Sequence, residues 1–153
     1  MTKRSALGDE SCFALWSHKT CRLACQTRAV VVAHLDTCVG ESIALLLRCK
    51  GFGAVHTPDL ESVELMLGYW RPGACLIDTR LGNINDFRFV RAAILDPAFQ
   101  RVLMVAMTNV FVEETPSVMR EVGFDSLCRR PCPVWRLADM LNSHFGPPRV
   151  ADR

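Results

Sequence analysis

From Ala29 onward, short apolar runs alternate along the chain with longer stretches in which apolar residues recur at helical spacing. A short continuous apolar run is typical of a strand buried on both faces, and the stretches between such runs are long enough for helices. Strands that alternate with helices form parallel sheets, because each crossover returns the chain to the same edge. The pattern therefore predicts an α/β fold in which five helices doubly wind a five-stranded parallel sheet. The predicted strands cover residues 29–33, 54–56, 74–77, 102–107 and 126–128.

Capping and turn residues indicate where the predicted helices begin and end. Thr57-Pro58 and Thr115-Pro116 each place a capping hydroxyl before a proline, which suits the first turn of a helix. Gly51 and Gly123 follow helical stretches, and Asp96-Pro97 follows another, so helices are expected to end there.

The length of 153 residues suits one domain with a single core. Residues 28–146 contain the alternating pattern and form the predicted domain, whereas residues 147–153 are expected to be a flexible tail. Residues 1–27 form an N-terminal extension in which Phe13 and Trp16 add more hydrophobicity than a disordered segment usually has. Two interpretations of this extension stay open: an extra helix, or an arm docked loosely on the domain.

Charge and hydropathy argue against several classes of function. The net charge of +2 gives no overall field that would attract nucleic acid or an anionic membrane. The longest apolar stretches, residues 29–33 and 102–107, are too short to span a bilayer, and the first residues lack the apolar segment of a secretory signal. We therefore expect a cytoplasmic protein with no membrane association and no direct contact with nucleic acid.

Eight cysteines are scattered through the predicted strands and helices. In a cytoplasmic domain of this size, reduced thiols packed in the core are the expected state. His18, Cys21 and Cys25 could share one helical face as metal ligands, but they lack paired Cys-x-x-Cys spacing and a fourth ligand. A cysteine-based redox or metal sensor is therefore the least favoured function.

Four of the predicted strands end in polar or charged residues. Asp78 closes one apolar run, Thr108 follows another, His34 follows the first strand, and Arg130 follows the last. Because the carboxyl ends of parallel strands meet at one edge of a sheet, these side chains are expected to share a site. Taken singly, each also has a local interpretation as a turn cap or a partner of nearby backbone.

In combination, these strand ends resemble the receiver domain of two-component response regulators. Residues 71–81 resemble the segment that ends in the phosphoacceptor aspartate, and residues 104–108 resemble the fourth strand with its switch hydroxyl. Residues 123–131 resemble the fifth strand, which the family follows with a lysine and a cis-proline. The resemblance covers residues 28–145 and implies a flavodoxin-like sheet of strand order 2-1-3-4-5. It implies that Asp78 is the phosphoacceptor position, Thr108 the switch hydroxyl, Arg130 the lysine equivalent and Pro131 the cis-proline.

The sequence departs from the family at the metal site. His34 and Leu35 stand where the family has two adjacent carboxylates. Asp78 alone is a poor cage for a hard divalent cation, and Asp36 restores one oxygen ligand only if the loop shifts by one residue. We therefore expect no metal and no other cofactor, with Mg²⁺ required only if Asp78 is a working phosphoacceptor.

Cations around the phosphoacceptor position suggest a different role for its carboxylate. Arg130 replaces the family's lysine, and His34 and Arg80 are further candidate cations. We expect Arg130 to hold Asp78 in a hydrogen-bonded ion pair that fixes the domain in one conformation. Leu127 stands where the family usually has a switch aromatic residue, which argues against the usual coupled movement of hydroxyl and ring.

The favoured function is a divergent single-domain receiver in signal transduction, which acts by binding a protein and not as an enzyme, with weakened or absent Mg²⁺-dependent phosphorylation. The expected partner is a histidine kinase, a phosphotransfer protein or a downstream regulator, and a homodimer is a further expectation. The alternative is a working receiver that such a kinase or phosphotransfer protein phosphorylates at Asp78. The family implies a partner face on the fourth helix, fifth strand and fifth helix, although Trp135 also suits the core. This face would include Arg120, Leu127, Arg129 and Trp135.

Overall fold

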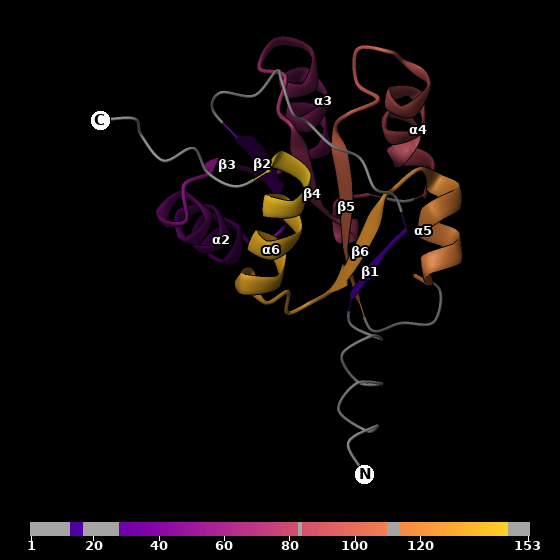
Figure 1. The fold of residues 1–153 in the computed structure, drawn as a ribbon. Helices are drawn as coiled ribbons and strands as arrows, with labels where there is room; N and C mark the ends of the chain where they lie inside the picture. Colours follow the sequence, from indigo (N-terminus) through magenta and orange to yellow (C-terminus); the bar gives the residue numbers. More distant parts are fainter. Residues whose placement is uncertain (1–12, 17–27, 83, 110–113, 147–153) are drawn as a thin grey trace.

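The computed structural model describes residues 13–16, 28–82, 84–109 and 114–146 (Figure 1). Strands and helices alternate along this part of the chain. The strands are β1 (Phe13–Leu15), β2 (Ala29–Ala33), β3 (Gly53–Thr57), β4 (Ala74–Asp78), β5 (Leu103–Thr108) and β6 (Ser126–Arg129). The α-helices are α2 (Thr37–Cys49), α3 (Leu60–Tyr69), α4 (Arg88–Leu95), α5 (Pro116–Val122) and α6 (Val134–Phe145), and the short 3₁₀ helices are η1 (Thr79–Leu81) and η2 (Ile84–Phe87).

The strands form a six-stranded sheet in the order β1-β6-β5-β4-β2-β3. Strands β2 to β6 run parallel, and their order matches the predicted 2-1-3-4-5. Helices α2 and α6 cover one face, where Ile43, Leu47 and Leu137 belong to one core cluster. Helices α3, α4 and α5 cover the other face (Figure 1). The predicted α/β fold, doubly wound by five helices, is therefore confirmed.

Strand β1 corrects the prediction of a five-stranded, all-parallel sheet. It pairs antiparallel with β6, where Phe13 lies opposite Cys128. The indole N–H of Trp16 then donates a hydrogen bond to the carbonyl of Phe124 at 2.7 Å. An edge strand leaves a row of backbone groups unpaired, and β1 supplies partners for those of β6. The extension thus contributes a strand at residues 13–15, where the sequence left an extra helix or a loose arm open.

Some expectations concern parts of the chain that the structure does not describe. These are the remainder of the extension, the tail at residues 147–153, and the candidate ligands His18, Cys21 and Cys25. Within the described ranges, no helix is long and apolar enough to cross a membrane.

The central strands explain the continuous apolar runs in the sequence. Strands β2, β4 and β5 are buried at every residue. Each lies between two neighbouring strands and beneath helices on both faces, so both alternating sets of side chains point into a core. The same burial extends to Asp78 and Thr108, the last residues of β4 and β5.

The ends of α5 follow the sequence prediction, and the start of α3 does not. The Thr115 hydroxyl accepts a hydrogen bond from the backbone N–H of Val118 at 3.3 Å, and Gly123 ends α5 with φ 120°. Thr57 was predicted to cap α3, but it is the last residue of β3 and pairs with β2. The carboxylate of Asp59 caps α3 instead, and the paired strand leaves Thr57 no capping role.

Replacement of Gly40 by alanine is expected to lower the free energy of unfolding by about 1–3 kcal/mol, measured by urea denaturation. Gly40 is buried in α2, and a β-carbon there would collide with the ring of His56 and lie 2.9 Å from Cβ of His34. Alanine ordinarily stabilises a helix relative to glycine, so this steric conflict reverses the usual sign.

Gly68 in α3 provides the matched control for that substitution. A β-carbon at Gly68 would meet no atom within 4 Å, so alanine there is expected to stabilise the domain by about 0.5–1 kcal/mol. If alanine stabilises at both positions, Gly40 is not packed closely against His34 and His56.

Candidate functional site

The carboxyl ends of four parallel strands bring the predicted site residues to one edge of the sheet. Strand β4 ends in Asp78, β5 ends in Thr108, β2 is followed directly by His34, and β6 is followed directly by Arg130. The peptide bond before Pro131 is cis, as predicted. The sequence therefore identified correctly which strand ends meet.

Asp78 is fully buried, and hydrogen bonds occupy both of its carboxylate oxygens. Oδ1 accepts from the backbone N–H and Nε of Arg80, at 3.0 and 3.1 Å, and from Nη1 of Arg130. Oδ2 accepts from the backbone N–H of Leu35 at 3.1 Å and from Nη2 of Arg80 at 2.8 Å. An ionised carboxylate offers about four lone-pair positions, so these donors saturate it.

Arg80 is the main side-chain partner of Asp78, whereas the sequence suggested it only as a further cation. The 3₁₀ helix η1 begins directly after Asp78, and the Asp78 carboxylate caps the backbone N–H of Arg80. The tight turn directs the Arg80 guanidinium back toward the Asp78 carboxylate. Its Nε and Nη2 both donate hydrogen bonds to Asp78 Oδ2. Such a fork gives a stronger and more directional contact than a point charge.

Arg130 forms the predicted ion pair with Asp78 and extends it to the neighbouring strand. Its Nη1 donates to Asp78 Oδ1, and its Nη2 donates to Oδ1 of Asn109, which follows β5. The Arg130 side chain is 11% exposed, compared with 37% for Arg80. Burial lowers the pKa of Arg130, but a guanidinium with an ordinary pKa above about 12 stays charged at neutral pH.

His34 lies close to Asp78 without acting as its counter-ion. Its Nδ1 accepts a hydrogen bond from the backbone N–H of Asp36 at 3.0 Å and lies 3.6 Å from Asp78 Oδ2. Burial, followed by the charges of Arg80 and Arg130, lowers the pKa of His34. A nitrogen that accepts from backbone carries no proton, so this contact and the lowered pKa make His34 the candidate cation that stays neutral beside Asp78.

Thr108 is fully buried beside this network, and its hydroxyl has no hydrogen-bond partner among the residues that the structure describes. Its carbonyl accepts from the backbone N–H of Arg130 at 2.8 Å, so its backbone is held in place. A buried hydroxyl without a protein partner is uncommon in proteins.

Glu114 reaches the site although the sequence analysis did not single it out. Its Oε1 accepts from the Thr79 hydroxyl at 2.8 Å, and its Oε2 accepts from the backbone N–H of Asn109 at 2.5 Å. Glu114 lies between β5 and α5, away from any strand end, so the strand-end pattern gives no signal for it. Glu114 therefore links Thr79, which follows Asp78, to Asn109, which follows Thr108.

The residues at this site do not fit Mg²⁺. The ion requires oxygen ligands in near-octahedral geometry, and both oxygens of Asp78 already accept from cationic and backbone donors. Leu35 presents a backbone N–H, which repels a cation, and Asp36 is exposed, where its carboxylate caps α2 at 3.2 Å from the N–H of Val39. No group of three or more potential metal-ligating side chains occurs within the described ranges.

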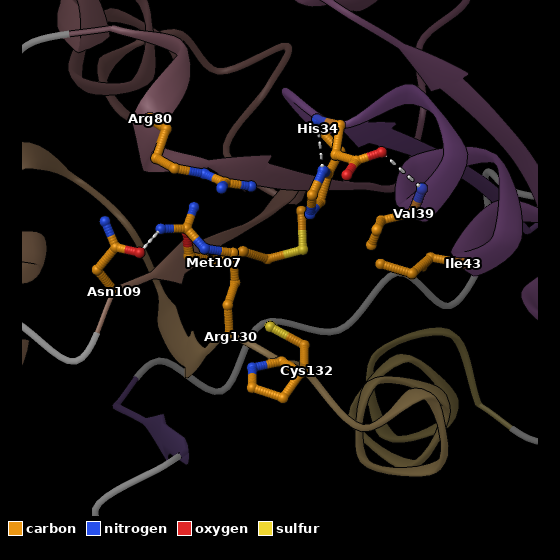
Figure 2. A pocket seen from close by; sticks show the side chains of 10 residues that line it. His34, Val39, Ile43, Arg80, Met107, Asn109, Arg130 and Cys132 are labelled. Carbon is orange, nitrogen blue, oxygen red and sulfur yellow. Dashed lines mark hydrogen bonds between the residues drawn. The ribbon is translucent and has the colours of Figure 1, made fainter.

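A pocket of about 400 Å³ opens beside the network. Figure 2 shows Arg80 and Arg130 on one side of it and Cys132 next to Arg130. Val39, Ile43 and Met107 give the pocket an apolar wall, and Asp36 lines it together with the two arginines, so charges of both signs border it.

The structure changes the predicted partner face at Leu127 and along the edge of β6. Leu127 is buried in the core, so its side chain cannot form part of a surface, and β1 covers the edge of β6. Trp135 is 57% exposed and not in the core, and Arg120 is exposed on α5. Nη1 of Arg129 donates to the carbonyl of Asn109 at 2.6 Å, which links this residue to the site.

Comparison with known proteins gives matches in structure but not in sequence. No protein-family model matches the chain, and the search of curated proteins gives no match. A response regulator receiver protein from Pseudomonas putida superposes with a TM-score of 0.67 at 19% identity, covering 79% of this chain and 100% of that chain.

Two further solved structures extend this likeness beyond one organism. A response regulator receiver domain protein from Methanospirillum hungatei gives a TM-score of 0.64 at 14% identity, covering 76% of this chain and 92% of that chain. The receiver domain of Saccharomyces cerevisiae Ssk1, solved with the histidine phosphotransfer protein Ypd1, gives 0.64 at 11% identity, covering 74% and 86%. The chain therefore has the fold of response regulator receiver domains.

Proposed function

We infer that this chain is a receiver-like signalling domain that acts by binding a protein partner, with its phosphoacceptor position held in a closed ion-paired network. The saturation of both Asp78 oxygens by Arg80, Arg130 and the backbone of Leu35 carries this inference. The receiver fold supplies the context of signal transduction, and we place the protein in the cytoplasm.

Phosphoryl transfer to Asp78 would require a carboxylate oxygen with a lone pair free to attack phosphorus. In this network each oxygen would first have to give up donors, two of them guanidinium groups. A metal and a cation normally neutralise the equatorial oxygens of the phosphoryl group during transfer. Here the cations neutralise the acceptor itself, so the same charges that stabilise the resting domain oppose the reaction.

Exposed side chains on α5 and α6 suit a protein partner. Trp135 and Arg120 lie on α6 and α5, and the Arg136 guanidinium lies 5.0 Å from the Trp135 ring. Trp and Arg are the residue types that most often dominate binding energy at interfaces. The structural likeness to a receiver solved with a phosphotransfer protein supports a signalling protein as partner, whether a kinase, a phosphotransfer protein or a downstream regulator.

One observation favours a second candidate, a working phosphoacceptor. Within the described part of the chain, the Thr108 hydroxyl is buried without a partner, at the position that the family uses as its switch hydroxyl. A phosphoryl group on Asp78 would give this hydroxyl an acceptor. This candidate requires that Arg80 and Arg130 release the carboxylate.

Incubation with acetyl phosphate and Mg²⁺, read by intact-mass spectrometry, separates the two candidates. Wild-type protein is expected to gain no phosphoryl group, because both Asp78 oxygens stay engaged. The Asp78→Asn variant is the control for modification at other residues. A gain of one phosphoryl group in wild type that is absent from Asp78→Asn would establish the second candidate and overturn the first.

A further inference from the structure

The outer face of α2 presents an apolar stripe to solvent. Val39, Leu45 and Leu46 on this helix are 43%, 54% and 47% exposed, and the thiols of Cys38 and Cys49 are exposed as well. Single exposed apolar residues are ordinary, whereas apolar residues repeated at intervals of three and four form the seam by which helices associate. The α2 stripe consists of Cys38, Val39, Ser42, Leu45, Leu46 and Cys49.

The charged residues of α2 contact their own domain and leave the stripe unbroken. Oε1 of Glu41 lies 3.5 Å from Nδ1 of His56, and Nη1 of Arg48 donates to a backbone carbonyl of β3 at 2.9 Å. The hydroxyl of Ser42, the polar residue in the stripe, donates to the carbonyl of Cys38 at 2.7 Å. A second helix can therefore cover Ser42 without leaving its hydroxyl unpaired.

The two ends of α2 carry opposite charges. Asp36 precedes the first residue of the helix, Lys50 follows the last, and both are exposed. They are fourteen positions apart, which is two heptads, so they lie along the same edge of the α2 stripe. In an antiparallel pair of these helices, Asp36 of each copy meets Lys50 of the other. A parallel pair would place like charges level with each other, which repel.

We propose that two copies of this chain associate through their α2 stripes, with the two helices antiparallel about a two-fold axis. Such an interface is isologous, so the stripe and the end charges of one copy meet the same features of the other. In the register that pairs Asp36 with Lys50, Val39 lies beside Cys49 of the second copy, and Leu46 lies beside its Ser42.

This interface is separate from the partner face of the proposed function. Figure 1 shows α2 on the left of the view and α5 on the right. The inference therefore goes beyond the proposed function, and phosphorylation of Asp78 would leave it standing. Helix α2 has 13 residues and is about 20 Å long, so its stripe is small beside the roughly 800 Å² per partner of a standard interface, and we expect weak association.

Sedimentation equilibrium of the full chain under reducing conditions measures this association. As the concentration rises from about 1 to 200 µM, the mass of wild type is expected to increase from 17.1 kDa towards twice that value. Leu46→Glu places a charge in the middle of the α2 stripe and is expected to raise the dissociation constant of the dimer at least about tenfold. Leu65→Glu is the matched control, because Leu65 is 60% exposed on α3, and it is expected to associate as wild type does.

The native thiols of Cys38 and Cys49 report the direction of the two helices. Within one copy they are eleven positions apart on α2, about 16 Å along its axis, which is too far for a short bismaleimide to span. In the antiparallel pair, Cys38 is nearly level with Cys49 of the second copy. A mixture of isotope-labelled and unlabelled protein is therefore expected to give a Cys38–Cys49 cross-link between the two kinds of chain, identified by peptide mass spectrometry.

Three results would overturn the proposal. Wild type could stay monomeric over the whole concentration range, or folded Leu46→Glu could associate as tightly as wild type. The cross-links could instead join Cys38 to Cys38 and Cys49 to Cys49, as a parallel pair requires. Because wild type alone gives the first and third of these results, the test holds even if a variant does not fold.

Discussion

Replacement of Asp78 by asparagine is expected to lower the free energy of unfolding by about 2–4 kcal/mol in urea denaturation. The substitution keeps the shape of the side chain but removes the charge that two guanidinium groups share. Arg130 is 11% exposed and would be left as a largely buried cation without a carboxylate. Loss of one member of a buried ion pair is strongly destabilising because the remaining charge stays desolvated.

The sign of this effect separates two kinds of site. In a cluster of carboxylates, mutual repulsion destabilises the resting domain, so removal of one negative charge stabilises it. In the network around Asp78 the carboxylate is attracted by Arg80 and Arg130, so its neutralisation destabilises the domain. Asp36→Asn is the matched control, because Asp36 is an exposed helix cap and asparagine caps about as well as aspartate. Increased stability of Asp78→Asn would show that the ion-paired network is wrong.

The sequence predicted the sheet and the common edge well because both depend on strong, local patterns. The runs at residues 74–77 and 102–107 are apolar at successive positions, which is typical of strands buried on both faces. Once these strands are parallel, their carboxyl ends must meet. The positions of Asp78, Thr108 and Arg130 at one site then follow from topology alone.

The remaining features depend on contacts that no short pattern encodes. Strand β1 has only three residues, and its pairing with β6 comes from a segment more than a hundred positions away along the chain. The hydrogen bonds from Arg80 to Asp78 depend on the tight turn of η1, which the sequence alone did not specify. Glu114 reaches the site from a loop. Residue spacing in a loop does not indicate which way a side chain points.

Three assignments changed in the structure, two at the site and one at the start of α3, and their physical causes are related. His34, Leu127 and Thr57 were each assigned from their position in a sequence pattern. Burial then decided their roles: it keeps His34 neutral, places Leu127 in the core and pairs Thr57 in β3. A pattern can locate a residue along a strand, whereas burial and hydrogen bonding decide what that residue does.

A variant that restores the family's charge pattern is expected to gain both Mg²⁺ binding and phosphorylation at Asp78. It combines His34→Asp and Leu35→Asp, which add oxygen ligands, with Arg80→Ala and Arg130→Lys, which release the Asp78 oxygens. Mg²⁺ at about a hundred times its dissociation constant would stabilise this variant by about 2.7 kcal/mol, whereas wild type is expected to show no shift in thermal unfolding.

The same variant is expected to gain one phosphoryl group from acetyl phosphate in the presence of Mg²⁺ and none in the presence of a chelator. Addition of Asp78→Asn to it provides the control, since the phosphoryl group should then be lost. Far-UV circular dichroism establishes that each variant is folded. If the folded variant binds Mg²⁺ but remains unmodified, the block to phosphorylation lies outside these four substitutions, with Asn109 and Glu114 as the next groups that close the site. If it binds no Mg²⁺, the Arg80 and Arg130 contacts are not what excludes the metal. Gain of both properties would show that the missing acidic pair and the ion-paired network together account for the inactivity proposed for wild type.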